Sequence, residues 1–455
     1  MKKLSLPLAL SLAACAAGLS AQQGPTPEMR ARITGITRAL TSFDPKSPET
    51  LDKLREDAFH ADFKKRLGVD QLRSMVARMR EDFGPFQIGE IRRRNPESIV
   101  LMVDGEKDEG RILVGVEPSP PHLITSMAIE IGGGEEAGPA PEVNGRMTPA
   151  ELSTAVDRFF AERAARDEFS GVVLIAKNGA PVVEKAYGFA LREEKRPNTP
   201  ATRFNIGSIN KAFTQTAIQQ LIAKGKIAPT DTIGRIFPEY PNKDAHGATV
   251  DQLLNHTGGI ANIFGPAFEA APKNQFRSNA DYFRFIAPMP LTFPPGTSRR
   301  YCNGCYIVLG AMIQKASGMT YEDYIAKNIF EPAGMRTAGW FDDTAADVAM
   351  GYIREGGALR PNRGTRGARG SAAGGGYATA ADLLAFDNAR RAGTLLDRTT
   401  MEEAGAQGGI GIAGGAPGLN AVLESAGEWT VVVVSNFDPP SAERVGPAIA
   451  QRLLK

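Results

Sequence analysis

Apolar positions in the first part of the chain recur at helical spacing and then at strand spacing. Residues 69–82 carry an apolar stripe of helical period, whereas residues 98–104 and 110–117 are short apolar runs of strand length. Helices that precede strands in this way are typical of a small α+β domain. We therefore predict such a domain over residues 22–131.

A helix and a hairpin open the second part of the chain. Residues 148–163 have the pattern of a helix, and Glu151 lies near its positively polarised start. Residues 171–177 and 180–187 are apolar strand candidates, and the Asn-Gly pair between them is a strong signal for a tight turn. The pattern predicts an antiparallel hairpin directly after the helix.

Helix and strand patterns continue to the end of the sequence. Apolar stripes over residues 209–225 and 306–316 predict helices that face a core. Residues 420–424 and 429–435 read as a pair of strands, and a final helix pattern covers residues 442–454. We expect these elements to belong to one mixed domain.

A segment rich in Gly, Glu and Pro separates the two parts. It spans residues 132–147 and interrupts both periodicities, as a flexible polar linker does. We predict a domain boundary there, with the second domain covering residues 148–455.

The first 21 residues have the pattern of an export signal. Lys2 and Lys3 precede an apolar stretch that ends in small residues at Ala21. Cleavage there predicts a periplasmic or secreted protein. The tetrapeptide that ends at Cys15 also resembles a bacterial lipobox, so lipid anchoring through Cys15 is the alternative. No later apolar run reaches the length of about 20 residues that a membrane helix needs, and we expect no transmembrane span.

Composition and charge argue against some classes of partner and cofactor. The 455 residues are 42% hydrophobic, which is ample for a large core, and the formal net charge of +2 argues against a nucleic-acid partner. The four histidines have no ligand spacing with cysteines or carboxylates, so we expect neither a metal nor another cofactor.

Cys302 and Cys305 form a C-x-x-C pair without a thioredoxin-like βαβ pattern. A local disulfide or two buried thiols is the favoured interpretation.

Candidate catalytic chemistry lies at residues 208–211. Ser208 precedes Lys211 by three residues at the start of the helix pattern, so one helical turn brings hydroxyl and amine to the same face. A serine hydroxyl is a poor nucleophile until a nearby base takes its proton. A desolvated lysine has a lowered pKa and can act as that base.

Several ordered motifs resemble the serine β-lactamase-like hydrolases, which include class C β-lactamases, D-Ala-D-Ala carboxypeptidases and related esterases. The resemblance covers residues 148–455 and rests on Ser-Ile-Asn-Lys at 208–211, Leu-Leu-Asn-His-Thr-Gly-Gly at 253–259 and Tyr-Cys-Asn at 301–303. It implies an α+β fold, in which an antiparallel sheet flanked by helices meets a helical subdomain. The catalytic cleft would lie between them.

The resemblance also implies residue roles. Ser208 would attack a carbonyl, Lys211 would relay protons, and Tyr301 would serve as base or as acid to the leaving group. Asn303 would orient the substrate's amide, and a backbone N–H near Gly415 would pair with that of the serine as an oxyanion hole. A phenol close to an ammonium should ionise more easily. Loop anchor and helix cap are the plainer interpretations of Tyr301 and Asn303.

The chain departs from the family at its third motif. Ile412-Ala413-Gly414 stands where Lys-Thr-Gly or a similar triplet is expected. The missing polar head removes a partner for a substrate carboxylate. We therefore favour hydrolysis of a neutral small-molecule or peptide ester or amide over β-lactamase or carboxypeptidase activity.

Two other hypotheses remain open. The altered third motif would also suit a catalytically decayed module that binds peptide or glycan without turnover. Alternatively, the first domain carries the function by binding a partner, and the hydrolase fold is a scaffold. His256 could suggest a Ser-His-Asp triad, but the resemblance assigns it to a structural turn away from the nucleophile.

Overall fold

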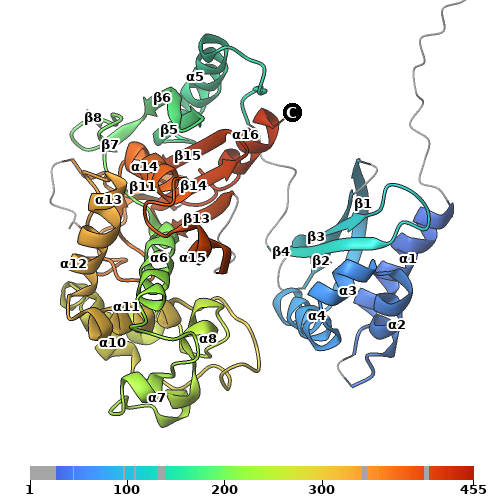
Figure 1. The fold of residues 1–455 in the computed structure, drawn as a ribbon. Helices are drawn as coiled ribbons and strands as arrows, with labels where there is room; N and C mark the ends of the chain where they lie inside the picture. The colour runs from blue at the N-terminus through green and yellow to red at the C-terminus, as the bar shows by residue number, and fades with distance from the viewer. Residues whose placement is uncertain are drawn as a thin grey trace, which may run out of the picture. The chain divides into compact units, whose positions relative to one another are not determined.

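The computed structural model describes residues 27–44, 46–95, 98–106, 109–131, 140–340, 347–355, 357–403 and 409–454. The chain divides into two compact units, residues 1–134 and 135–455. Both are drawn in Figure 1. The predicted export signal and residues 132–139 of the predicted linker lie outside the described residues.

Helices come before strands in the first unit, as the sequence pattern predicted. The helices are α1 (Pro27–Thr41), α2 (Glu49–Ala58), α3 (Ala61–Arg66) and α4 (Val69–Phe83). The strands are β1 (Phe86–Asn95), β2 (Ser98–Gly105), β3 (Glu109–Val116) and β4 (Ile124–Ile131), paired antiparallel in chain order.

One face of this small sheet is buried by the helices. Ile99, Leu101 and Val103 alternate along β2 and share a core cluster with Leu72 and Val76 of α4. Side chains two residues apart on a strand point to the same face, so this alternation makes one side of β2 the core side.

An antiparallel sheet of five strands forms the centre of the second unit, in the order β13-β14-β15-β5-β6. The strands are β5 (Gly171–Lys177), β6 (Ala180–Tyr187), β13 (Ile410–Ala416), β14 (Leu419–Ala426) and β15 (Trp429–Ser435). The register pairs Val173 of β5 with Val433 of β15, so the two ends of the unit share the sheet. The expected hydrolase-like α+β architecture is confirmed.

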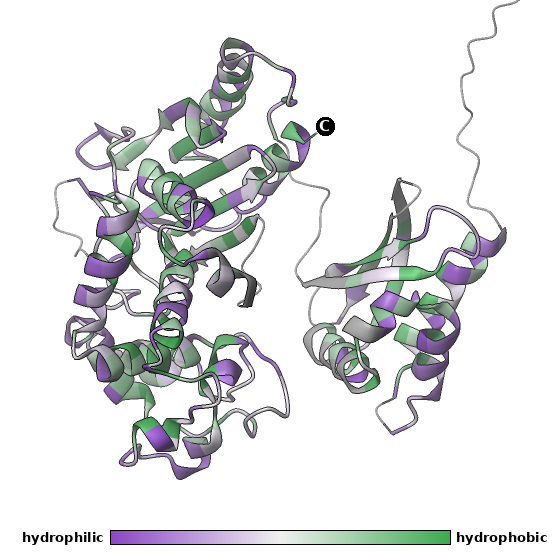
Figure 2. Cartoon of the chain, viewed as in Figure 1, coloured by the Kyte–Doolittle hydropathy of each residue, from purple (hydrophilic) through white to green (hydrophobic). Residues whose placement is uncertain are grey.

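Both faces of this sheet are covered. Val431 and Val433 join a cluster with α5 (Pro149–Ala165) and α16 (Val445–Leu453). Val432 and Val434 point the other way, into the largest cluster. Strands buried on both faces are apolar throughout, and β5 and β15 are drawn largely in the hydrophobic colour in Figure 2.

The largest cluster continues into a helical region. Its main helices are α6 (Asn210–Ala223), α8 (Val250–Leu254), α10 (Asn279–Ile286), α11 (Asn303–Ser317) and α12 (Tyr321–Ile325), with α14 (Ala380–Arg391) beside the sheet. Figure 1 shows α7 (Ile233–Ile236), α8, α10 and α11 gathered at the end of the unit away from the sheet. No helix among the described residues is both long and apolar enough to cross a bilayer.

Two predicted helix starts were wrong by three residues. The last helix begins at Val445 rather than at 442, and just before it the N–H groups of Ala442 (2.6 Å) and Glu443 (2.9 Å) donate to the Asn420 side chain. Helix α11 begins at Asn303 rather than at 306. Apolar periodicity does not mark where a helix starts, because the first backbone N–H groups have no partner within the helix.

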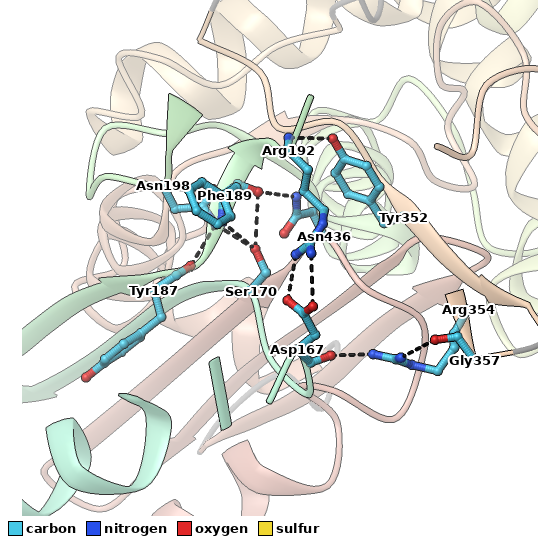
Figure 3. Close-up of polar contacts among 10 residues, drawn as sticks. All are labelled: Asp167, Ser170, Tyr187, Phe189, Arg192, Asn198, Tyr352, Arg354, Gly357 and Asn436. Atoms are coloured by element: carbon cyan, nitrogen blue, oxygen red, sulfur yellow. Dashed lines mark hydrogen bonds and ion pairs between the residues drawn. The ribbon is translucent and has the colours of Figure 1, made fainter. Parts of the chain in front are cut away.

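A buried polar network fixes the end of the sheet where β5 begins (Figure 3). The Asn198 amide donates to Ser170 Oγ at 2.9 Å, and the Asn436 amide donates to two backbone carbonyls at 3.0 and 2.7 Å. Arg192 pairs with both carboxylate oxygens of Asp167 at 2.7 and 2.9 Å. The Asn436 bonds satisfy two backbone carbonyls, and the side-chain bonds of Asn198 and Arg192 help to hold the connection in one geometry.

Candidate active site

Ser208 lies in a 3-10 turn, Gly207–Ile209, directly before α6. Gly207 has φ +51°, which favours glycine, and a Cβ there would lie 2.9 Å from Leu419 Cδ1 and 3.0 Å from the backbone of Gly414. The turn therefore presses Ser208 against the edge strand β13. This placement leaves the half-buried hydroxyl at the boundary between sheet and helices.

The amine of Lys211 is buried beside this hydroxyl, with the residue only 5% exposed. Its Nζ donates to Ser208 Oγ (3.2 Å), to Asn303 Oδ1 (2.8 Å) and to the carbonyl of Ala373. Burial lowers the pKa of Lys211 to about 7. Near neutral pH the amine is therefore available as a proton acceptor as well as a donor.

A second group reaches the same oxygen from the other side. The Tyr301 hydroxyl donates to Ser208 Oγ at 2.7 Å. The Tyr301 residue is 53% exposed, but its hydroxyl end lies in the site, and desolvation there raises the pKa of Tyr301, partly offset by the bond to Ser208. The expected easier ionisation was wrong, because desolvation outweighs the neighbouring amine, which is itself easily deprotonated.

Asn303 is held on both sides of its amide. The oxygen accepts from Lys211, and Nδ2 donates to Asn262 Oδ1 at 3.1 Å. It is not the cap of its helix, because Cys302 occupies that position. The structure thus brings Asn303 to the lysine, and the sequence reasoning missed Asn262 and the Ala373 carbonyl. Their only signals were proximity to the Gly-Gly at 258–259 and to the glycines at 374–376.

The strand that carries the altered third motif packs directly on the nucleophile's turn. A Cβ on Gly414 would lie 2.1 Å from Ile206 O and 2.7 Å from Ser208 N, so a side chain cannot fit there. Ile412 packs against the large core cluster, whereas Ala413 and Gly415 face a hollow beside Ser208. The backbone of β13 is therefore adjacent to the N–H of the nucleophile without any help from polar side chains.

Two hollows meet at Ser208 and Tyr301. The larger, of about 720 Å³, has an apolar part formed by Ile263, Phe264 and Phe268. Its remaining lining includes the glycine-rich segment around residues 364–375.

The smaller hollow, of about 560 Å³, is lined by small residues and two carboxylates. Asp438 accepts from the backbone N–H groups of Gly418 (2.7 Å) and Arg354 (2.6 Å), and Glu443 accepts from the Asn420 amide (3.0 Å). The smaller hollow is therefore acidic, whereas the larger hollow combines its apolar part with charged side chains of both signs, Glu269, Lys273, Arg366 and Arg369.

His256 supports the site rather than forming a triad. It lies in a turn with φ +62°, and its Nδ1 accepts the N–H of Cys302 at 3.2 Å. The hydrogen bonds of the described residues include none between His256 and Ser208. Its ring packs on Tyr301 with centroids 4.9 Å apart, so it lies closer to the nucleophile than expected. Burial, with the nearby Lys211 amine, lowers the pKa of His256 to about 4.

The cysteine alternatives are resolved, because Cys302 and Cys305 form a disulfide. Within the described ranges, no group of three or more His, Cys, Asp or Glu side chains is arranged to hold a metal ion.

A five-stranded antiparallel sheet covered on both faces, with serine and lysine one helical turn apart at its edge, defines a class of penicillin-binding-type serine hydrolases. The family model described as Beta-lactamase matches residues 156–454, and the chain belongs to this family. The resemblance drawn from the motifs and the assignment as a serine hydrolase are thereby confirmed.

Individual relatives agree with the family. The Bacillus subtilis protein PbpX is 32% identical over 288 residues, which cover 59% of this chain and 71% of PbpX. Esterase EstB of Burkholderia gladioli is 27% identical over 220 residues, 45% of this chain and 56% of the esterase. The crystal structure of a penicillin-binding protein from Bacillus halodurans superposes with a TM-score of 0.58 at 28% identity, over 64% of this chain and 98% of that one.

Proposed function

We propose that the chain is an exported hydrolase that cleaves a neutral ester or amide through an acyl-enzyme on Ser208. The proposal rests on one observation. The Ser208 Oγ lies within hydrogen-bond distance of both Lys211 Nζ (3.2 Å) and Tyr301 OH (2.7 Å), and the amine has a pKa of about 7. A nucleophile in contact with a base and with an acid is the minimum that acyl transfer requires.

In the acylation step, the neutral Lys211 amine accepts the Ser208 proton while Oγ bonds to the substrate carbonyl carbon. The oxygen that becomes negative lies between the backbone N–H groups of Ser208 and Gly415. Tyr301 keeps its proton at neutral pH, because its pKa is raised, and it donates that proton to the leaving group. The ammonium of Lys211 then returns a proton to the phenolate.

Water completes the cycle by the same route in reverse. It attacks the acyl carbon, passes one proton to the site, and Ser208 leaves with a proton from Lys211 or Tyr301. No net charge accumulates, because each proton removed at one stage is restored at the next.

The two hollows support a neutral substrate. The apolar part of the larger hollow, with Phe264 and Phe268, suits an uncharged acyl group, and its volume is in the range of small-molecule sites. Asp438 and Glu443 would repel a substrate carboxylate from the smaller hollow, and Ala413 has no group to bind one, so a carboxylate would find cationic side chains only in the larger hollow. The likeness to an esterase agrees with this selection.

Export is part of the proposal. The basic and apolar pattern of residues 1–21 supports it, and the disulfide between Cys302 and Cys305 fits an oxidising compartment. The periplasm or the medium is the expected location, with a lipid anchor at Cys15 as the alternative. Digestion and mass spectrometry of the mature protein would distinguish a terminus after Ala21 from a lipidated Cys15.

A fluorophosphonate probe tests the nucleophile. We expect one adduct per folded molecule, mapped to Ser208 by mass spectrometry, and none in Ser208→Ala. Ser317→Ala, on the far end of α11 and outside both hollows, is the matched control and should label as the unsubstituted protein does. A folded protein that gives no adduct would reject the acyl-enzyme and favour the binding module without turnover.

A further inference from the structure

The disulfide lies inside the segment that supplies two of the site's side chains. Tyr301 and Asn303 are the two chain neighbours of Cys302, and Cys302 is bonded to Cys305 in the first turn of α11. The backbone of Cys302 is extended, with φ −129° and ψ 96°. Any rotation about this one residue would therefore move a phenol on one side and an amide on the other.

The tyrosine depends on its backbone for position. Because the Tyr301 residue is 53% exposed, burial contributes little to holding it. Its described contacts are the His256 ring at 4.9 Å, the Lys211 amine at 4.8 Å from the centre of the phenol ring, and the hydroxyl bond to Ser208 at 2.7 Å. The N–H of Cys302 donates to the same histidine at 3.2 Å. The next constraint along the chain is the Cys302–Cys305 disulfide.

Helix α11 also lacks an oxygen at its cap. The Cys302 Sγ accepts the N–H of Cys305 at 2.9 Å, in the place where Ser, Thr, Asp or Asn usually caps a helix. Sulfur is a weak acceptor. The covalent bond to the first turn supplies the constraint that a strong cap would give elsewhere.

The start of the helix fits closely against the turn that carries the histidine. A Cβ on Gly304 would lie 2.1 Å from the Ala261 carbonyl and 2.8 Å from Ile260 Cγ2. Asn303, next in the chain, binds Asn262 of the same segment at 3.1 Å. The disulfide therefore ties a tightly packed helix start to the buried Cys302, whose preceding neighbour is the exposed Tyr301.

We propose that the Cys302–Cys305 disulfide is a positioning element of the catalytic site, so that the hydrolase reaches full turnover only when this bond has formed. The kinetic part of this inference rests on the proposed function. A displacement of about 1 Å can cost on the order of 100-fold in rate, and Tyr301 and Asn303 must both be aimed within such limits.

The chemical step is a thiol–disulfide exchange. A dithiol reductant supplies two electrons and two protons, the S–S bond breaks into two thiols, and the reductant becomes a disulfide. Both sulfurs belong to buried residues, Cys302 at 3% and Cys305 at 0% exposure. The bond is therefore shielded once formed. A chain still in a reducing compartment would have lower turnover than the exported one, which would limit hydrolysis before export.

The test separates the covalent bond from the cap. In Cys302→Ser/Cys305→Ala the serine hydroxyl can still cap α11, but no disulfide can form. With a p-nitrophenyl ester we expect kcat to fall at least about 10-fold and KM to change less than about 3-fold, because binding in the hollows is retained. Unsubstituted protein that has been unfolded, reduced, alkylated with a small reagent and refolded should show the same loss.

Stability is controlled with a second buried change on the same helix. Ile313→Val removes one methylene from a fully buried side chain of α11 and should lower Tm while leaving kcat unchanged. Full kcat in the folded double variant would overturn the proposal and leave the disulfide a purely stabilising bond.

Hydrogen exchange gives a readout that does not depend on turnover. Amides of residues 297–305 should exchange faster in Cys302→Ser/Cys305→Ala than in the unsubstituted protein, and unchanged exchange would overturn the proposal. If the unsubstituted protein neither labels at Ser208 nor cleaves an ester, the proposed function fails, and the exchange comparison still decides whether the disulfide positions the segment.

Discussion

Lys211 combines burial with three acceptors, one of which is the nucleophile. Its amine contacts Ser208, Asn303 and the Ala373 carbonyl, and no carboxylate is among the partners described for it. An ammonium buried in this way is destabilised relative to the amine. The surroundings thus keep much of the amine unprotonated at neutral pH, and the unprotonated amine is the form that can accept a proton.

This environment predicts the pH dependence of hydrolysis. Because the unprotonated amine must accept the serine proton, kcat/KM should rise with pH through about 7 and level off above. Lys211→Ala should lower kcat/KM by about 10²–10⁴. Lys224→Ala, at the exposed end of α6, is the control. The pH limits of the measurement, 5 and 9, lie about two units either side of the pKa of the Lys211 amine. A kcat/KM that stays constant over this range in the unsubstituted enzyme would contradict the role of Lys211 as the base.

His256 offers a second prediction at this scale. Its pKa of about 4 keeps it neutral wherever the enzyme is active, and its contacts are with Tyr301 and Cys302. His256→Ala should lower kcat about 10-fold by loosening Tyr301, yet leave the inflection near pH 7 in place. Loss of that inflection in His256→Ala would instead make the histidine the base.

At the scale of elements, the site depends on how the edge strand β13 meets the turn before α6. No hydrogen-bonding side chain of β13 takes part. Gly414 lets the two backbones approach, and the altered residues Ile412 and Ala413 leave this contact intact. The missing lysine therefore changes what the cleft can recognise rather than how the nucleophile is held.

Two glycines on β13 make this testable. Gly414→Ala would place a methyl against Ile206 O and Ser208 N, and it should lower stability by about 1–3 kcal/mol and slow probe labelling of Ser208. In Gly411→Ala, the methyl meets only the flexible end of Glu424, at 3.0 Å. Thermal unfolding and labelling rates should separate the two. Equal behaviour of both variants would show that close approach at 414 is unimportant.

For the whole molecule, the hydrolase unit has all the parts of its own site. The clusters on both faces of the five-stranded sheet and both hollows consist of residues from 140 onward. The first unit has a separate core over residues 27–131. The proposed hydrolysis should therefore not require the first unit.

Removal of the first unit tests this independence. A chain of residues 135–455 should fold, label at Ser208 and cleave a p-nitrophenyl ester with kcat within about 2-fold of the full chain, because no part of either hollow is lost. A large fall in kcat with normal unfolding would assign the first unit a part in catalysis. A cellular defect with intact hydrolysis would support a partner-binding role for it.

Local pattern determined much of this protein. The bounds of β5, β6 and β15 agree with the sequence prediction, because short apolar runs and an Asn-Gly turn are properties of adjacent residues. The contact between Ser208 and Lys211 could likewise be predicted from the sequence, since the two residues are one helical turn apart.

Tertiary structure decided what depends on distant residues. The segment before α16 is bound by the distant Asn420, and the lysine's other partners come from residues 303 and 373. The raised pKa of Tyr301 and the different linings of the two hollows also arise only on folding. Burial and long-range hydrogen bonds are properties of the packed chain, and no local spacing encodes them.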